Sequence, residues 1–121
     1  MLARARRVTR PDDFRRILRY GRKAGARRLV VHLLGDADPV TAPARAGLVV
    51  GRGVGVAVVR HRVSRRLRHV LRDRLDALPG GTAVVVRALP PAGVASSAQL
   101  AQDLDTALRR LRSPADQERK R

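Results

Sequence analysis

Seven arginines lie within fifteen consecutive residues, from position 60 to position 74 of a 121-residue chain. Apolar residues recur between them at steps of three and four residues, and this spacing is typical of a helix with one buried side. Only Asp73 falls within this run, and Asp76 follows it. Guanidinium groups suit phosphates, and so many like charges at helical spacing need an external anion. The run predicts a polyanion-binding surface, and a merely solvated amphipathic helix is the alternative.

The residues that could carry out hydrolysis do not form a pattern. No two carboxylates have a spacing useful for acid–base work, and no nucleophile has a base beside it in the sequence. His32, His61 and His69 lack metal-ligand spacing, and the chain has no cysteine. His69 and Asp73 stand one helical turn apart, which we interpret as a surface pair. The residues therefore indicate binding rather than catalysis, with no catalytic residue and no metal held by the protein alone.

The overall charge supports the same interpretation. Lys and Arg total 27 against 10 acidic residues, giving a net charge of +17, and the cations concentrate in residues 1–28 and 45–74. A hydrophobic content of 44% allows a small core despite this self-repulsion. The apolar runs are too short to span a membrane, and no secretion signal is apparent. We expect a soluble, cytoplasmic protein whose partner is a polyanion.

The elements that position the arginines can be read from hydrophobic periodicity, Pro and Gly. Pro11, two acidic residues and Gly21 mark a first helix, and Ser96 with Gln99 matches a capping box for the last helix. Residues 45–50 and 56–59 are expected to form a hairpin around the turn 51–55. The predicted order is helix 11–20, strand 29–34, strand 45–50, strand 56–59, helix 61–78, strand 82–88 and a helix that ends before Ser113.

This order predicts an α+β fold in which helices pack on a small, mostly antiparallel four-stranded sheet, a two-layer α/β sandwich. Residues 1–112 are expected to form a single domain, because a chain of this length usually makes one core. Residues 113–121 are expected to be a flexible basic tail. The sheet and its helices would hold the arginine-rich helix 61–78 at the surface.

The residues from 51 to 72 resemble the signature of the bacterial ribonuclease P protein family, and they read GRGVGVAVVRHRVSRRLRHVLR. The positions that carry the resemblance are Gly51, Val54, Gly55, Ala57, Val58, Arg60, Arg62, Val63, Arg65, Arg66, Leu67 and Arg68. It extends to Phe14, Gly21, Arg45, Gly47, Leu48 and Arg87, and covers residues 5–112. The resemblance implies a fold like that of ribosomal protein S5 domain 2.

The resemblance also implies a function and its partners. Proteins of this family accompany a catalytic RNA that removes the 5′ leader from precursor tRNA, and the RNA with its Mg²⁺ carries the chemistry. One protein per RNA is expected. The residues that would bind the catalytic RNA are Arg60, His61, Arg62, Arg65, Arg66, Arg68 and Arg72. The residues that would form a leader-binding cleft between the first helix and the sheet are Phe14, Leu18, His32, Arg45, Arg52 and Arg87.

This sequence departs from the family pattern at four positions. His61 stands where Asn is usual, Ser64 and Gly53 stand where Lys is common, and Leu18 replaces a second aromatic residue. Another small basic RNA-binding protein, such as a ribosomal protein, is the main alternative. A DNA-binding helix module would need a helix-turn-helix rather than intervening strands. A stand-alone nuclease would need the carboxylate cluster that the sequence lacks.

Overall fold

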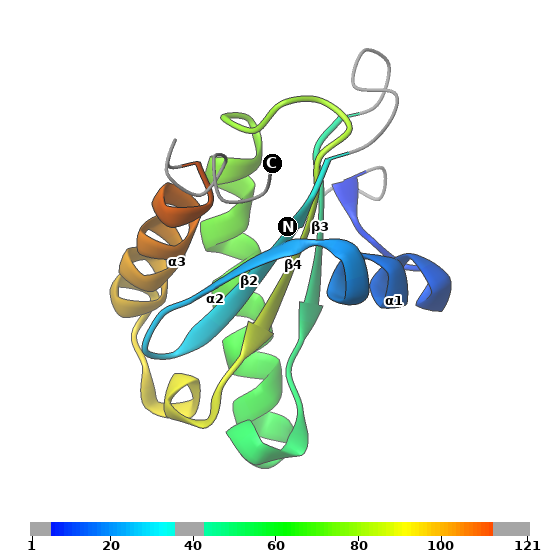
Figure 1. Ribbon diagram of the computed structural model, residues 1–121. Coiled ribbons are helices and arrows are strands. Elements are labelled where there is room, and N and C mark those ends of the chain that lie inside the picture. Colours follow the sequence, from blue (N-terminus) through cyan, green and yellow to red (C-terminus); the bar gives the residue numbers. More distant parts are fainter. Residues whose placement is uncertain (1–5, 36–42, 113–121) are drawn as a thin grey trace.

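The computed structural model describes residues 6–35 and 43–112, which form three α-helices and a four-stranded sheet (Figure 1). The α+β class is confirmed, whereas the predicted tail 113–121 lies outside the described residues. In chain order the elements are α1 Pro11–Tyr20, β1 Arg22–Gly25, β2 Leu29–Leu34, β3 Arg45–Val49, the 3-10 turn η2 Arg52–Val54, α2 Ala57–Leu75, β4 Ala83–Ala88, the 3-10 turn η3 Pro90–Val94 and α3 Ser97–Arg112.

The strands lie in the order β1-β2-β4-β3. β2 runs antiparallel to both β1 and β4, while β3 and β4 are parallel. A parallel pair needs a crossover connection, and α2 is that connection between β3 and β4. The outer edge of β3 meets the N-terminal segment, where the Val8 amide donates to the Ala46 carbonyl at 2.9 Å. The arginine-rich helix is therefore fixed at both ends by neighbouring strands.

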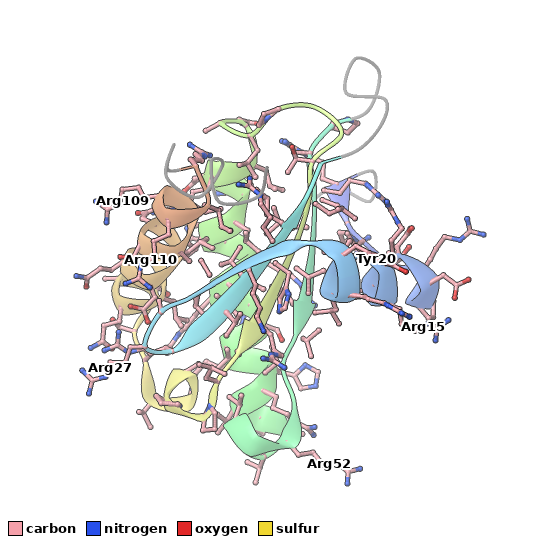
Figure 2. The ribbon with its side chains drawn as sticks, in the orientation of Figure 1. Arg15, Tyr20, Arg27, Arg52, Arg109 and Arg110 are labelled. Carbon is pink, nitrogen blue, oxygen red and sulfur yellow. The ribbon has the colours of Figure 1, made fainter. Side chains whose placement is uncertain are left out.

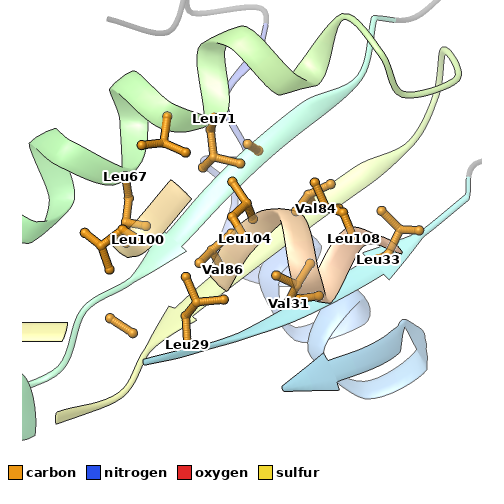
Figure 3. Close-up of a cluster of buried hydrophobic side chains, with 14 of the residues drawn as sticks. Leu29, Val31, Leu33, Leu67, Leu71, Val84, Val86, Leu100, Leu104 and Leu108 are labelled. Atoms are coloured by element: carbon orange, nitrogen blue, oxygen red, sulfur yellow. The ribbon is translucent and has the colours of Figure 1, made fainter. Parts of the chain in front are cut away.

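Helices cover both faces of the sheet. Successive residues of a strand point to opposite faces, so each strand can contribute to two cores. Val84 and Val86 of β4 belong to the larger core, beneath α2 and α3, whereas Ala83 and Val85 belong to a smaller core with Ile17 of α1. Figure 1 shows α1 on the side of the sheet away from α2 and α3. The larger core is drawn in Figure 3 and includes Leu29, Val31, Leu33, Leu67, Leu71, Val84, Val86, Leu100, Leu104 and Leu108.

The predicted helix boundaries have clear local causes. Pro11 occupies the first turn of α1, and the Gly21 amide closes that helix on the Ile17 carbonyl at 2.9 Å. The capping box of α3 is confirmed in both directions. The Ser96 amide donates to Gln99 Oε1 at 3.0 Å, and the Gln99 amide donates to Ser96 Oγ at 3.1 Å. These reciprocal bonds satisfy two amides that the first turn of a helix leaves without partners.

The predicted strand 56–59, and the hairpin it would make with 45–50, are wrong. Val56 is the residue before α2, and the Arg60 amide donates to the Val56 carbonyl at 3.0 Å, as in a helix. Val56 and Val58 are 71% and 73% exposed, whereas Val59 packs against the core. β-branched valines suggested a strand, but the η2 turn directs the chain into the crossover helix, and tertiary packing overrides local propensity.

Two further differences concern β1 and the ends of α2. The sequence pattern missed β1, because Arg22–Gly25 contains no β-branched residue, and it forms by pairing with β2, where Lys23 lies opposite His32. The helix predicted at 61–78 spans Ala57–Leu75, and the Leu78 amide then bonds to the Leu75 carbonyl at 3.1 Å. No helix within the described ranges is sufficiently long and apolar to cross a membrane.

Candidate nucleic-acid interface

α2 turns its apolar stripe inward and a set of basic side chains outward. Val63, Leu67, Leu71 and Leu75 are buried, at spacings that place them on one side of the helix. The basic residues on the opposite side are all exposed. We call them the outer face of α2, and they are His61, Arg65, Arg68, His69 and Arg72.

The outer face of α2 contains a hollow that basic side chains line. A depression of about 430 Å³ is lined by His61, Arg65, Arg68 and His69. A second depression beside it shares Arg65 and His69, and is completed by Arg62, Arg66 and Ser97. Four basic side chains around one hollow create a positive potential, which attracts an anion such as a phosphate.

None of the acidic side chains that the structure describes lines this hollow. Each of the six Asp residues that the structure describes forms an ion pair with an arginine. Asp73 pairs with Arg72 at 3.9 Å, and no ion pair joins it to His69 in the described part of the chain. His69 and Asp73 are thus both at the surface, as predicted, but they form no ion pair among the described residues, and His69 lines the two hollows.

Arg62 and Arg66 lie on the flank of α2 and contact the η3 segment. Arg62 Nη2 donates to the Gly93 carbonyl at 3.1 Å, and Arg66 Nη1 donates to the Ala95 carbonyl. Both arginines were predicted to bind RNA. The structure engages each of them in a hydrogen bond that holds η3 against α2, so they differ in environment from the exposed Arg65 and Arg68.

Arg74, the last arginine of the sequence run, joins α2 to α3. Its Nε and Nη2 donate to the two carboxylate oxygens of Asp105, at 2.6 and 3.0 Å. These hydrogen bonds are the main reason that the pKa of Asp105 is lowered and that of Arg74 is raised. Arg74 therefore stabilises helix packing rather than extending the outer face of α2.

The opposite side of the sheet offers a second surface, at the edge of α1. Phe14 lies directly over Gly47 of β3, where an added Cβ would come within 2.7 Å of the Phe14 ring. Leu18 packs partly buried against the same small core. Strand register places Val30, Arg87 and Val49 in one row across β2, β4 and β3. Arg87 is exposed in the middle of this row, and Val49 at its end packs against the same small core as Phe14 and Leu18.

His32 is a buried polar side chain on this second surface. It faces the α1 side because Val31 and Leu33, its neighbours on β2, belong to the larger core. Its exposed fraction is 5%, and neither ring nitrogen has a hydrogen-bond partner among the described residues. Burial lowers the pKa of His32, and the charges of Arg87 and Lys23 lower it further. The imidazole is therefore neutral at pH 7, with both its donor and its acceptor unused.

The two surfaces meet at the edge of β3. One hollow is lined by Phe14 of α1, Arg68 of α2, Gly47 of β3 and the N-terminal residues Arg7 and Thr9, together with Val8, Ala46 and Leu48. An aromatic ring and two guanidinium groups thus surround one depression. Such a combination suits single-stranded nucleic acid, which presents both base faces and phosphates.

Comparison with known proteins decides the family. The family model for ribonuclease P matches residues 2–112 of this chain. The chain belongs to the ribonuclease P protein family. The ribonuclease P protein component of Streptomyces griseus is 56% identical over 117 residues, covering 92% of this chain and 95% of the relative. Membership makes the chain a protein subunit of ribonuclease P, which acts in tRNA processing and has the ribonuclease P RNA as its partner.

Solved structures of ribonuclease P proteins share the fold. The Staphylococcus aureus protein superposes with a TM-score of 0.75 at 24% identity, over 86% of this chain and 93% of its own. The Thermotoga maritima protein gives a TM-score of 0.70 at 22% identity, over 83% and 92% of the two chains. The predicted α+β architecture of the ribonuclease P protein family is therefore present in this chain.

The residues predicted for the leader-binding cleft do not all lie together. Phe14, Leu18, His32 and Arg87 share the α1 side of the sheet, as described above. Arg45 is on the same side, but it forms an ion pair with Asp13 of α1, in which Arg45 Nη1 lies 3.6 Å from Asp13 Oδ2. Arg52 belongs to η2, beyond the end of β3, and points outward at the end of the molecule (Figure 2).

Some basic residues near both surfaces were missed in the sequence analysis. Lys23 of β1 lies opposite His32, and the strand that carries it gave no pattern to recognise. Arg7 lines the hollow with Phe14 and Arg68, although the sequence offered only a basic N-terminal stretch as a signal. His69 could have been found, because it follows Arg65 by one helical turn.

Proposed function

We propose that the outer face of α2 binds the ribonuclease P RNA while the α1 side of the sheet binds the 5′ leader of precursor tRNA, with one protein per RNA, in the cytoplasm. The observation that carries this proposal is the hollow at the edge of β3, which brings Phe14 and Arg68 together. One molecule can then contact catalytic RNA and substrate next to each other. Arg60, half-buried in the first turn of α2, and the flanking Arg62 and Arg66 border the RNA-binding side.

The leader would be held by stacking and by phosphate contacts. Phe14 offers an aromatic face to a base, and stacking of this kind contributes about 1 to 3 kcal/mol per base. Arg87 and Arg52 are exposed and offer guanidinium groups to the backbone, whereas the buried ring nitrogens of His32 lie beneath this surface. Phosphate contacts position an RNA without reading its sequence. The protein would therefore accept leaders of many sequences.

The proposal assigns hydrolysis of the leader to the RNA and to Mg²⁺ held mainly by it. Mg²⁺ prefers carboxylate, phosphate and water oxygens. All six described carboxylates are already in ion pairs, and no group of three or more His, Cys, Asp or Glu side chains in residues 6–35 and 43–112 is placed to hold a metal ion. The described residues thus offer no ready Mg²⁺ site, and in this proposal the protein binds and positions the RNAs.

Reconstitution tests the proposal. The full-length protein is added to a bacterial ribonuclease P RNA at a Mg²⁺ concentration too low for the RNA to work alone, and leader removal from precursor tRNA is measured. We expect the protein to restore cleavage, and the protein without RNA to leave the substrate intact. Absence of stimulation, or cleavage by the protein alone, would contradict the proposal.

A further inference from the structure

Two histidines, His61 and His69, line the hollow on the outer face of α2. His61 precedes Arg65 by four residues and His69 follows it by four, so all three lie on one side of the helix. Both histidines are exposed, and together with Arg65 and Arg68 they line one hollow. The third histidine, His32, is buried on the other side of the sheet.

We infer that His61 and His69 form, with Arg65 and Arg68, a proton-linked phosphate site for the ribonuclease P RNA. In this site the protonated imidazoles contact phosphate oxygens, so RNA binding takes up protons and strengthens as the pH falls. The inference rests on the proposed docking of α2 on the RNA. It adds His69 to the binding residues and gives the interface a dependence on pH.

The groups that face the two histidines come from several elements. On α2 the cations Arg62, Arg65, Arg66 and Arg68 line the same two hollows as the histidines, and Asp73, one turn after His69, pairs with Arg72 at 3.9 Å. α3 contributes the uncharged Ser97, and η3 with the residue after it contributes the carbonyls of Gly93 and Ala95, which accept from Arg62 and Arg66. The N-terminal segment contributes Arg7, in the hollow that Arg68 also lines.

An RNA phosphate would therefore supply the negative charge that this hollow lacks. A neutral imidazole donates one hydrogen bond, whereas a protonated imidazole donates two and carries a charge. A nearby anion favours the charged form.

The experiment measures affinity for ribonuclease P RNA against salt at about pH 5.5 and about pH 8. Each phosphate contact adds about 0.7 to 0.9 to the slope of log affinity against log salt. We expect the slope of the unaltered protein to be steeper at the lower pH, by up to about 1.4 to 1.8 for two histidines. The His61→Asn, His69→Gln double variant should lose this difference, and Arg65→Ala, Arg68→Ala should keep it while lowering the slope at both pH values.

The outcomes separate the inference from the proposed function. If the salt slope changes equally with pH in the unaltered protein and in the histidine variant, the inference is overturned. Such a change would come from groups that both proteins share, such as His32, or from the RNA bases. An unchanged slope in the arginine variant overturns docking through α2 instead. Circular dichroism at both pH values checks folding. If the double variant does not fold, His69→Gln alone should lose about half of the slope difference, and no loss would overturn the inference.

Discussion

At the scale of single residues, the position of Phe14 depends on a glycine opposite it. Gly47 leaves room for the Phe14 ring, and a Cβ there would approach the ring to 2.7 Å. The ring is only partly buried, since it also lines the open hollow with Arg68. One aromatic side chain thus contributes both to the small core and to a surface that can stack on a base. These two roles can be separated by measurement.

Phe14→Ala should weaken binding of precursor tRNA to the holoenzyme and leave mature tRNA binding unchanged, because only the precursor carries a leader. Loss of about 1 to 3 kcal/mol of stacking corresponds to roughly 5- to 150-fold weaker binding. Tyr20→Ala is the matched control, because Tyr20 is 65% exposed on the same helix and its ring faces Arg19. Equal weakening for both RNAs, accompanied by a lower Tm, would mean that the ring serves only the core.

The same scale shows an ionic contact whose effect depends on pH. The pKa of Asp105 is lowered in the folded protein, chiefly by its hydrogen bonds to Arg74. A carboxyl group of this kind stabilises the fold at pH values above its ordinary pKa of about 3.9, and that stabilisation is lost as the pH falls through the folded value. We expect the free energy of unfolding to fall more steeply below about pH 4 in the unaltered protein than in Asp105→Asn. The free energy of unfolding is measured by urea denaturation at several pH values. If it decreased equally with pH in the two proteins, this expectation would be contradicted.

At the scale of elements, α2 divides its arginines between two tasks. Arg65 and Arg68 are exposed, whereas Arg62 and Arg66 hold η3 through its carbonyl groups. The sequence pattern cannot make this division, because all four residues avoid the apolar stripe. Arg62 and Arg66 hydrogen-bond to the carbonyls of Gly93 and Ala95 because the fold brings these distant residues beside α2.

Two double variants of α2 test this division. Arg65→Ala, Arg68→Ala should lower the salt slope of RNA binding by about 1.4 to 1.8 while leaving Tm nearly unchanged. Arg62→Ala, Arg66→Ala should instead destabilise the fold, by up to about 1.5 to 3 kcal/mol for each charged hydrogen bond lost. Thermal denaturation and RNA binding at several salt concentrations measure both effects. Similar behaviour of the two variants would contradict the division.

Elements with a strong periodic pattern could be predicted from the sequence, and those formed by pairing could not. The five buried residues of α2 follow the helical period, and the capping box of α3 is local, so both were recognised. β1 forms only because β2 offers it an edge, and the valines at 56–59 enter a helix because the crossover to β4 requires one. For the candidate site, residue types identified the cations, but their partners depend on contacts between distant segments.

At the scale of the whole molecule, positive charge surrounds the protein. Figure 2 shows Arg15 of α1, Arg27 between β1 and β2, Arg52 of η2 and Arg109 of α3 on different sides of the molecule. With a net charge of +17, self-repulsion opposes the compact state, and anions that bind the folded protein relieve it. The outer face of α2 differs from the other basic surfaces because its hollow gathers four basic side chains and no carboxylate.

Sulfate at low millimolar concentration should therefore raise the Tm of the free protein above that in chloride of equal ionic strength. A gain of 1 kcal/mol would correspond to roughly 2 to 8 °C for a domain of this size. Sulfate also stabilises proteins in general through exclusion from their surface, but this effect needs higher concentrations and acts on variants alike. The Arg65→Ala, Arg68→Ala variant, which lacks the two guanidinium groups of the hollow, should lose most of the gain. If it kept the full gain, the anion would bind elsewhere on the molecule, and charge density on α2 would not be what distinguishes the docking surface.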